Sequence, residues 1–117
     1  MPFGFNAVRG EVLANTDTIS GRVYVLGLSV VPTYYPATET LGIKVDALVK
    51  LYNGSSATGD PLIQVPVVMT EAYPADMGFD YVEHGGYVLF PDGLYTEIPT
   101  PTTGAVGDIS LSVYYQV

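Results

Sequence analysis

The 117-residue chain contains no cysteine, no tryptophan and a single histidine, His84. The absence of cysteine excludes a disulfide framework and a thiolate zinc site. A serine triad would have to use His84, and the sequence has no Gly-x-Ser-x-Gly turn to hold the nucleophile. A chain of this length buries enough surface for one apolar core without disulfides. We therefore expect one domain over residues 1–117, without thiolate or triad chemistry.

Charge is also scarce, and basic charge most of all. Charged residues make up 14% of the chain, against roughly 25% in an average soluble domain, and the net charge is −8. All four basic residues lie among the first 50, where four acids balance them, and eight acids follow. No basic stripe is present to bind a phosphate backbone or an anionic membrane surface, so we expect neither nucleic acid nor membrane as a partner. The first residues lack the basic and apolar regions of a targeting segment.

The acids are densest between residues 71 and 92. This stretch holds five acids beside the only histidine: Glu71, Asp76, Asp80, Glu83 and Asp92. Hard oxygen ligands on loops can hold calcium, but the spacing does not match a calcium-binding loop. A pair of carboxylates for glycoside chemistry is not indicated either, because twelve acids supply many pairs. We predict a solvated acidic face with no metal, no cofactor and no catalytic residue, and a protein that is not an enzyme.

Alternation of apolar and polar residues with period two is the main structural signal. It predicts strands over residues 43–52, 62–69 and 109–117. The predicted inward residues are Ile43, Val45, Ala47, Val49 and Leu51 in the first strand, Ile63, Val65, Val67 and Met69 in the second, and Ile109, Leu111, Val113, Tyr115 and Val117 in the third. Pro66 removes a backbone donor, so the second strand should lie at a sheet edge or carry a bulge.

Further strands are predicted over shorter stretches. Residues 23–31 are apolar on both faces, which indicates a central strand or one covered by a partner. Residues 7–13 form a strand with Arg9 and Glu11 outward, and residues 87–90 and 94–98 flank a tight turn. Together these segments predict an all-β, two-sheet antiparallel β-sandwich of about seven to eight strands, either jelly-roll or immunoglobulin-like.

Tyrosine is unusually frequent, with ten residues against four phenylalanines. Two pairs are adjacent in sequence, Tyr34-Tyr35 and Tyr114-Tyr115. On a strand, one ring of each pair must face outward, and exposed tyrosine is enriched at protein interfaces. Residues 1–6 are a candidate N-terminal arm whose aromatics either dock on a partner or fold back on the domain. The candidate interface residues are Phe3, Phe5, Tyr34, Tyr35 and Tyr114. Tyrosines beside acids also suit sugar binding.

Three stretches carry a resemblance to a known group of proteins. They are Tyr-x-Gly-Ser-Ser-Ala-x-Gly at the end of residues 47–59, Gly-Leu-Tyr at the end of residues 86–95, and residues 107–116, with the sequence Gly-Asp-Ile-Ser-Leu-Ser-Val-Tyr-Tyr-Gln. In this order they resemble small all-β virion proteins of tailed bacteriophages, including cyanophages. The resemblance extends from about residue 43 to residue 117.

The resemblance implies a structural virion protein of the capsid decoration, or cement, type. Its implied partners are the major capsid protein and further copies of itself, as a homo-oligomer on the capsid surface, assembled in the host cytoplasm. The alternative is a phage fibre or tail component that acts as a glycan- or receptor-binding module. Copy number per particle separates the two roles.

Overall fold

The structure is a computed structural model, and it describes residues 7–36, 48–66, 68–69, 74–75, 77–98 and 105–117. All regular structure in these residues is β-strand. In chain order the strands are β1 (Arg9–Leu13), β2 (Thr18–Ile19), β3 (Val23–Pro36), β4 (Leu48–Asn53), β5 (Ile63–Pro66), β6 (Val68–Met69), β7 (Pro74–Ala75), β8 (Met77–Asp80), β9 (Val88–Phe90), β10 (Leu94–Glu97) and β11 (Ala105–Gln116).

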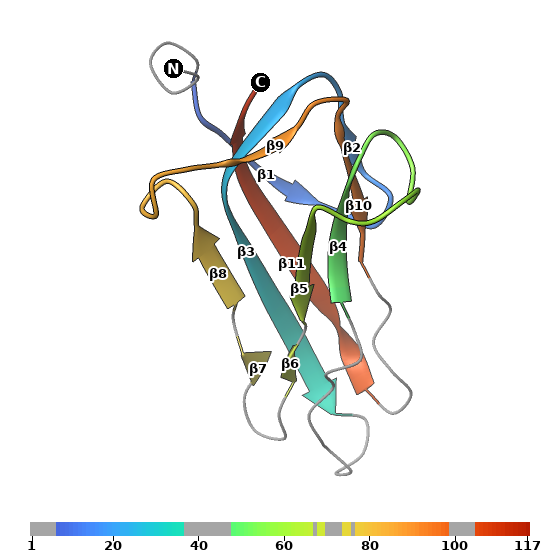
Figure 1. The fold of residues 1–117 in the computed structure, drawn as a ribbon. Helices are drawn as coiled ribbons and strands as arrows, with labels where there is room; N and C mark the ends of the chain where they lie inside the picture. The colour runs from blue at the N-terminus through green and yellow to red at the C-terminus, as the bar shows by residue number, and fades with distance from the viewer. Residues whose placement is uncertain (1–6, 37–47, 67, 70–73, 76, 99–104) are drawn as a thin grey trace.

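Nine of these strands form two antiparallel sheets. The five-stranded sheet has the order β1-β11-β3-β8, with β9 pairing a second stretch of β3, and the four-stranded sheet has the order β2-β10-β4-β5. Among the described strands, β6 and β7 pair only with each other. The long strands β3 and β11 run side by side along the molecule (Figure 1). The predicted two-sheet antiparallel β-sandwich is confirmed.

Apolar side chains from both sheets meet in one core. The alternation predicted for β4, β5 and β11 is confirmed where the structure describes it: the buried residues are Val49, Leu51, Ile63, Val65, Ile109, Leu111, Val113 and Tyr115. Each such side chain contributes about 1.5–3 kcal/mol by leaving water. The predicted inward residues Ile43, Val45, Ala47 and Val67 lie outside the described residues, as does the side chain of Met69.

The core requires β3 to be central, as its apolar character predicts. Its pairing with β11 shifts by one residue, so that Tyr114 lies opposite Gly27 whereas Tyr115 lies opposite Val25. The skipped residue, Leu26, forms a β-bulge, and the bulge restores the inward direction on both sides of it. Val25 and Leu28 are both buried as a result, and Gly27 lies opposite Tyr114 on the outer side of the sheet.

The strand edges and turns also follow from local sequence. β5 is an edge strand, as Pro66 predicts. Gly54 and Gly93 have φ values of 113° and 110°, which only glycine adopts without strain, and they form the adjacent turns after β4 and before β10. Asn53 joins the two turns, because its Oδ1 accepts a hydrogen bond from the backbone N–H of Asp92 at 2.9 Å.

One prediction for β1 is wrong. Arg9 and Glu11 were expected to face outward, but they pair with the buried residues Tyr115 and Val113, so they lie on the inner side of the sheet. The Tyr115 hydroxyl donates a hydrogen bond to Oε1 of Glu11 at 2.8 Å. Both charged residues are exposed nevertheless, because β1 is at the sheet edge and the second sheet does not cover them. Arg9 and Glu11 are therefore exposed without facing the outer side of the sheet.

Three further residues depart from simple alternation. Val117 was expected inward but is 42% exposed, because it follows the end of β11. Gln116 follows the inward Tyr115 and pairs with Tyr24 on the outer side, yet it is 1% exposed. Tyr52 is also outward by register yet only 6% exposed, because its ring packs beside Tyr95 on the next strand.

Candidate interaction surfaces

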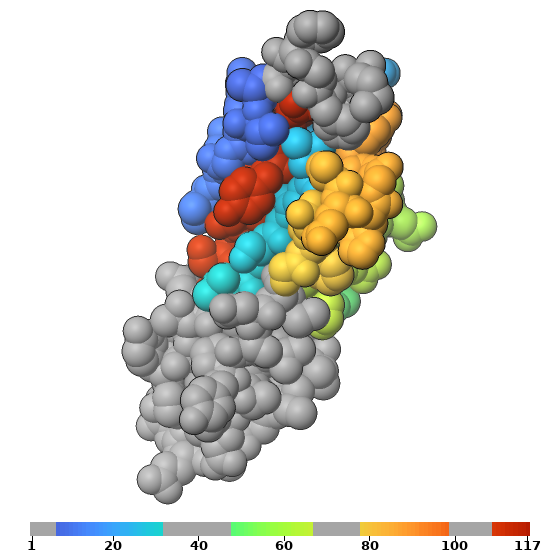
Figure 2. Space-filling model, turned by 90° about the vertical axis from the view of Figure 1, so that its left-hand side faces the viewer, coloured from blue at the N-terminus to red at the C-terminus, as the bar shows by residue number. Residues whose placement is uncertain are grey.

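The outer face of the five-stranded sheet carries exposed apolar side chains. Residues of β1 and β11 that face outward pair as Gly10 with Tyr114 and Val12 with Ser112. Val12 is 71% exposed, Tyr114 is 48% exposed, and Val8, just before β1, is 58% exposed. Figure 2 shows this face, with β1 in dark blue at its left rim, then β11 in red, β3 in cyan and the β8 region in gold. We call it the open face.

The Tyr114 ring packs against β1 at Gly10. A Cβ atom added to Gly10 would be 3.2 Å from both Cδ1 and Cε1 of that ring. Glycine at this position therefore lets the ring rest on the backbone, where any larger residue would lift it. The predicted outward direction of Tyr114 is confirmed, and its ring offers contact area at a low cost in conformational entropy.

A groove of about 380 Å³ runs beside this ring. Its lining residues come from both neighbours of β3: Val8 and Tyr114 from one side, Leu26, Gly27 and Leu28 from β3 itself, and Phe79, Asp80 and Val82 from the other side. The floor is low because Gly27 has no side chain, and a Cβ there would come within 2.9 Å of the Phe79 carbonyl oxygen. The groove is mostly apolar with one carboxylate, and it adjoins exposed valines, so groove and valines together form an apolar patch of the kind found at interaction sites.

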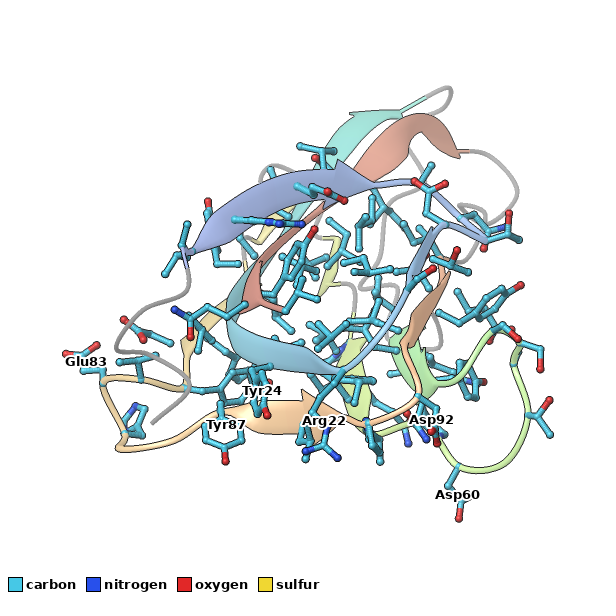
Figure 3. All side chains as sticks on the ribbon, turned by 90° about the horizontal axis from the view of Figure 1, so that it is seen from above. Arg22, Tyr24, Asp60, Glu83, Tyr87 and Asp92 are labelled. Carbon is cyan, nitrogen blue, oxygen red and sulfur yellow. The ribbon has the colours of Figure 1, made fainter. Side chains whose placement is uncertain are left out.

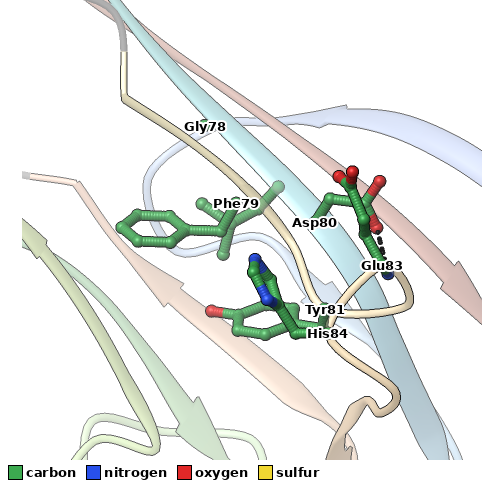
Figure 4. A pocket seen from close by; sticks show the side chains of 7 residues that line it. Gly78, Phe79, Asp80, Tyr81, Glu83 and His84 are labelled. Atoms are coloured by element: carbon green, nitrogen blue, oxygen red, sulfur yellow. Dashed lines mark hydrogen bonds between the residues drawn. The ribbon is translucent and has the colours of Figure 1, made fainter.

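A second hollow, of about 500 Å³, lies on the other side of β8. The Phe79 and Tyr81 rings stack there, with centroids 6.3 Å apart and planes inclined by 11°. His84 also lines this hollow, and its backbone N–H donates a hydrogen bond to the Tyr81 carbonyl oxygen at 3.2 Å. The carboxylates of Asp80 and Glu83 point to the other side of the strand (Figure 4). Asp80 Oδ1 accepts a hydrogen bond from the Glu83 backbone N–H at 3.1 Å, which fixes the turn. Burial raises the pKa of Tyr81 above its ordinary value.

The acidic loops project into solvent where the structure describes them. Asp60, Glu83 and Asp92 lie on three separate loops and are all exposed (Figure 3). Asp80 is exposed as well, whereas Glu71 and Asp76 lie outside the described residues. No group of three or more His, Cys, Asp or Glu side chains within the described residues could hold a metal ion.

The predicted interface residues have different outcomes. Phe3 and Phe5 lie outside the described residues. Tyr34 and Tyr35 lie in β3, with backbones opposite Gly107 and Val106, but their side chains are outside the described part. Their backbones are seven and eight positions along β3 from Gly27, which pairs with Tyr114, or roughly 23 and 26 Å away. The structure therefore does not bring these two tyrosines to the groove.

Sequence reasoning missed several residues of the open face: Val8, Val12, Leu26, Gly27 and Val82. Val8 and Val12 could have been found from the sequence, because they alternate with Arg9 and Glu11 and one of these two sets has to face outward. The groove could not be predicted from the sequence pattern, because it depends on the pairing of β3 with β8, two segments that are distant in sequence.

Comparisons with protein families, with curated proteins and with solved structures find no match to this chain. None of the described residues belongs to a helix long and apolar enough to span a membrane.

Proposed function

We propose that this protein is a structural component of a phage virion, a capsid decoration protein that binds the head shell through its open face. The resemblance of residues 43–117 to small phage virion proteins suggests the setting. One observation supports this docking surface: Val8, Val12 and Tyr114 are exposed on one face, beside an apolar groove. Apolar patches of this kind on a charge-poor protein favour association with another protein surface.

Tyr114 is the expected anchor of this contact. Large aromatic side chains near the centre of an interface contribute much of its binding energy. The major capsid protein is the proposed partner, and further copies of this chain would lie beside it on the lattice. Many weak contacts repeated over a shell resist its expansion together, because each bound copy raises the effective concentration of its neighbours.

The test is a binding assay with purified shells that lack this protein. Tyr114→Ala should weaken binding about tenfold or more, the effect of removing an anchor of about 1.4 kcal/mol or more. Tyr95→Ala is the matched control, because Tyr95 lies on the outer side of the other sheet. Unchanged binding by Tyr114→Ala, with both melting temperatures preserved, would remove the open face from the proposal.

The copy number of the protein in purified particles tests the location. A number comparable to that of the major capsid protein supports decoration, and a small fraction of it supports a fibre or tail.

Deletion of residues 2–5 tests the N-terminal arm. An anchoring arm predicts lost shell binding at an unchanged melting temperature, and an arm folded back on the domain predicts a lower one.

A glycan-binding role is the second candidate, and the hollow beside β8 favours it. Stacked aromatic rings can pack against the apolar face of a sugar, and the His84 imidazole, which also lines the hollow, can form a hydrogen bond with a sugar hydroxyl. Glycan-array binding that is lost in Phe79→Ala and His84→Ala, and kept in the exposed control Asp60→Asn, would support this role. Absence of binding to any glycan of the host surface would exclude it.

A further inference from the structure

Strand β1 is an open edge of the five-stranded sheet. Among the described strands only β11 pairs with it, so one row of its backbone N–H and C=O groups points away from the sheet. Arg9, Gly10, Glu11 and Val12 are all exposed. Such an edge can accept a further strand by backbone hydrogen bonding. Unlike β5, this edge has no proline to prevent pairing.

The charges of β1 match a second copy of itself. Arg9 and Glu11 lie on the same side of the strand, with Gly10 between them. If two copies pair antiparallel about an axis at Gly10, each Arg9 lies directly opposite Glu11 of the second copy. Inward charges often keep edge strands apart, but these two have opposite signs in this register and attract each other. Tyr115 holds the Glu11 carboxylate in place at 2.8 Å before any pairing.

The apolar residues of β1 match in the same register. An axis at Gly10 places Val8 opposite Val12 of the second copy, on the outer side of both strands. These two valines have the largest exposed fractions among the exposed large apolar residues, 58% and 71%. One pairing register therefore covers both valines and neutralises both charges, and a shift by one or two residues loses this match.

We propose that two copies of this protein pair through β1, antiparallel and about a two-fold axis at Gly10, so that their five-stranded sheets become one continuous sheet. The open faces of both copies then lie on the same side of that sheet. The contact is isologous, as in most protein dimers. It is also short, so the dimer is weak in dilute solution and strengthens where copies are held close together. The proposal concerns the chain itself and does not depend on a virion role.

Charge reversal tests the pairing. Arg9→Glu makes both positions acidic, and Glu11→Arg makes both basic, so each variant should repel its own copies. An equimolar mixture of the two should associate again, because every facing pair is then opposite in charge. Arg22→Glu and Glu83→Arg are the controls, since they change the net charge equally at exposed residues away from β1. Sedimentation of the parent chain from about 10 µM to about 1 mM should show a monomer–dimer equilibrium, the range expected for a short interface.

Cysteine cross-linking tests the register, and the chain has no cysteine of its own. Val8→Cys mixed with Val12→Cys should form a disulfide dimer, because facing Cβ atoms lie about 4.5–5.5 Å apart. Either variant alone should not, because identical positions are then separated by about 13 Å along the strand.

A parent chain that stays monomeric over the whole range overturns the proposal. So does a mixture of the two charge variants that fails to associate, or variants that associate as well alone as the parent does. If Val8→Cys forms a disulfide with itself, and the mixture yields no disulfide between position 8 and position 12, the axis does not lie at Gly10. Because shells take no part in these measurements, their failure leaves the shell-binding test unaffected.

Discussion

The outer faces of the two sheets differ in how their side chains are paired. On the four-stranded sheet, Lys50 Nζ lies 3.8 Å from Glu97 Oε1, and the Tyr52 hydroxyl donates a hydrogen bond to the same oxygen at 3.3 Å. The Tyr52 ring also packs on Tyr95 across the strands, with centroids 6.3 Å apart. On the open face, the outward positions around the groove hold Gly10 and Val12 of β1, Ser112 and Tyr114 of β11, Gly27 and Ser29 of β3, and the Asp80 carboxylate of β8.

The difference indicates which face is prepared for a partner. Cross-strand pairs on the four-stranded sheet satisfy one another's charges and hydrogen bonds, so a partner would have to disrupt them. The open face has small residues, a groove and exposed valines, and a partner would displace only water from them. Both faces come from strands of the same sandwich, and the distinction lies in the outward set of residues alone.

The largest expected effect separates the inner from the outer side of the five-stranded sheet. Val113→Asp places an unpaired charge in the core and should lower the free energy of unfolding by about 3 kcal/mol or more. Val12→Asp, at an exposed position opposite Ser112, should cost under about 0.5 kcal/mol in dilute protein. Urea denaturation measures both. Equal losses would mean that the open face is covered within the single chain.

A smaller loss should follow Gly27→Ala at the floor of the groove. The added Cβ would come within 2.9 Å of the Phe79 carbonyl oxygen, and the backbone of β8 would have to move. We expect a loss of about 1–3 kcal/mol, as for other overpacked sites. Gly86→Ala is the control, because no atom lies within 4 Å of its Cβ. Faster amide exchange in β8 should accompany the loss in Gly27→Ala, and unchanged exchange there would contradict the close approach.

Alkaline pH should reduce stability through the tyrosines. Burial, and then the hydrogen bond to Glu11, raise the pKa of Tyr115, whereas Arg9 lowers it in part. The unfolded chain then loses its phenol proton first, at about pH 10, so stability is complete below this pH and falls above it. Tyr115→Phe should make the fall shallower. Melting temperatures between pH 8 and about 11 measure this, and an unchanged slope would assign the effect to other tyrosines.

The smallest effect concerns the ion pair on the four-stranded sheet. The side chains of Lys50 and Glu97 are 33% and 42% exposed, so water screens their attraction. A double-mutant cycle with Lys50→Ala and Glu97→Ala should give a coupling of about 0.2–1 kcal/mol. A coupling near zero would mean that the side chains of this face are held by the packing of Tyr52 on Tyr95 and not by the ion pair. The two outer faces would then differ in aromatic packing rather than in charge pairing.

The sequence predicted the sandwich because strand alternation is a local property. Val49, Leu51 and Val113 are inward by period two alone, and Pro66 marks an edge because it lacks a donor. The bulge at Leu26 could not be predicted from alternation, because it depends on the register between β3 and β11.

The candidate surface was less predictable than the fold. The outward direction of Tyr114 follows from the period of β11. The direction of Arg9 and Glu11 was wrong, because charge normally indicates a solvent-facing side, and an edge strand lets charged residues reach water from the inner side. The groove requires β8 to pair with β3, a contact between distant segments whose register no local pattern specifies.

The position of β11 between β1 and β3 has a consequence for biosynthesis. β1 and β3 are translated early, but the strand that joins them is the last of this sequence to leave the ribosome. At the usual rate of synthesis, roughly 5–20 s separate the appearance of β1 from that of β11. The β4–β5 hairpin can form during this interval, because its partners are close in sequence. The nascent chain therefore carries β1 and one edge of β3 without their partner until translation reaches residues 109–116.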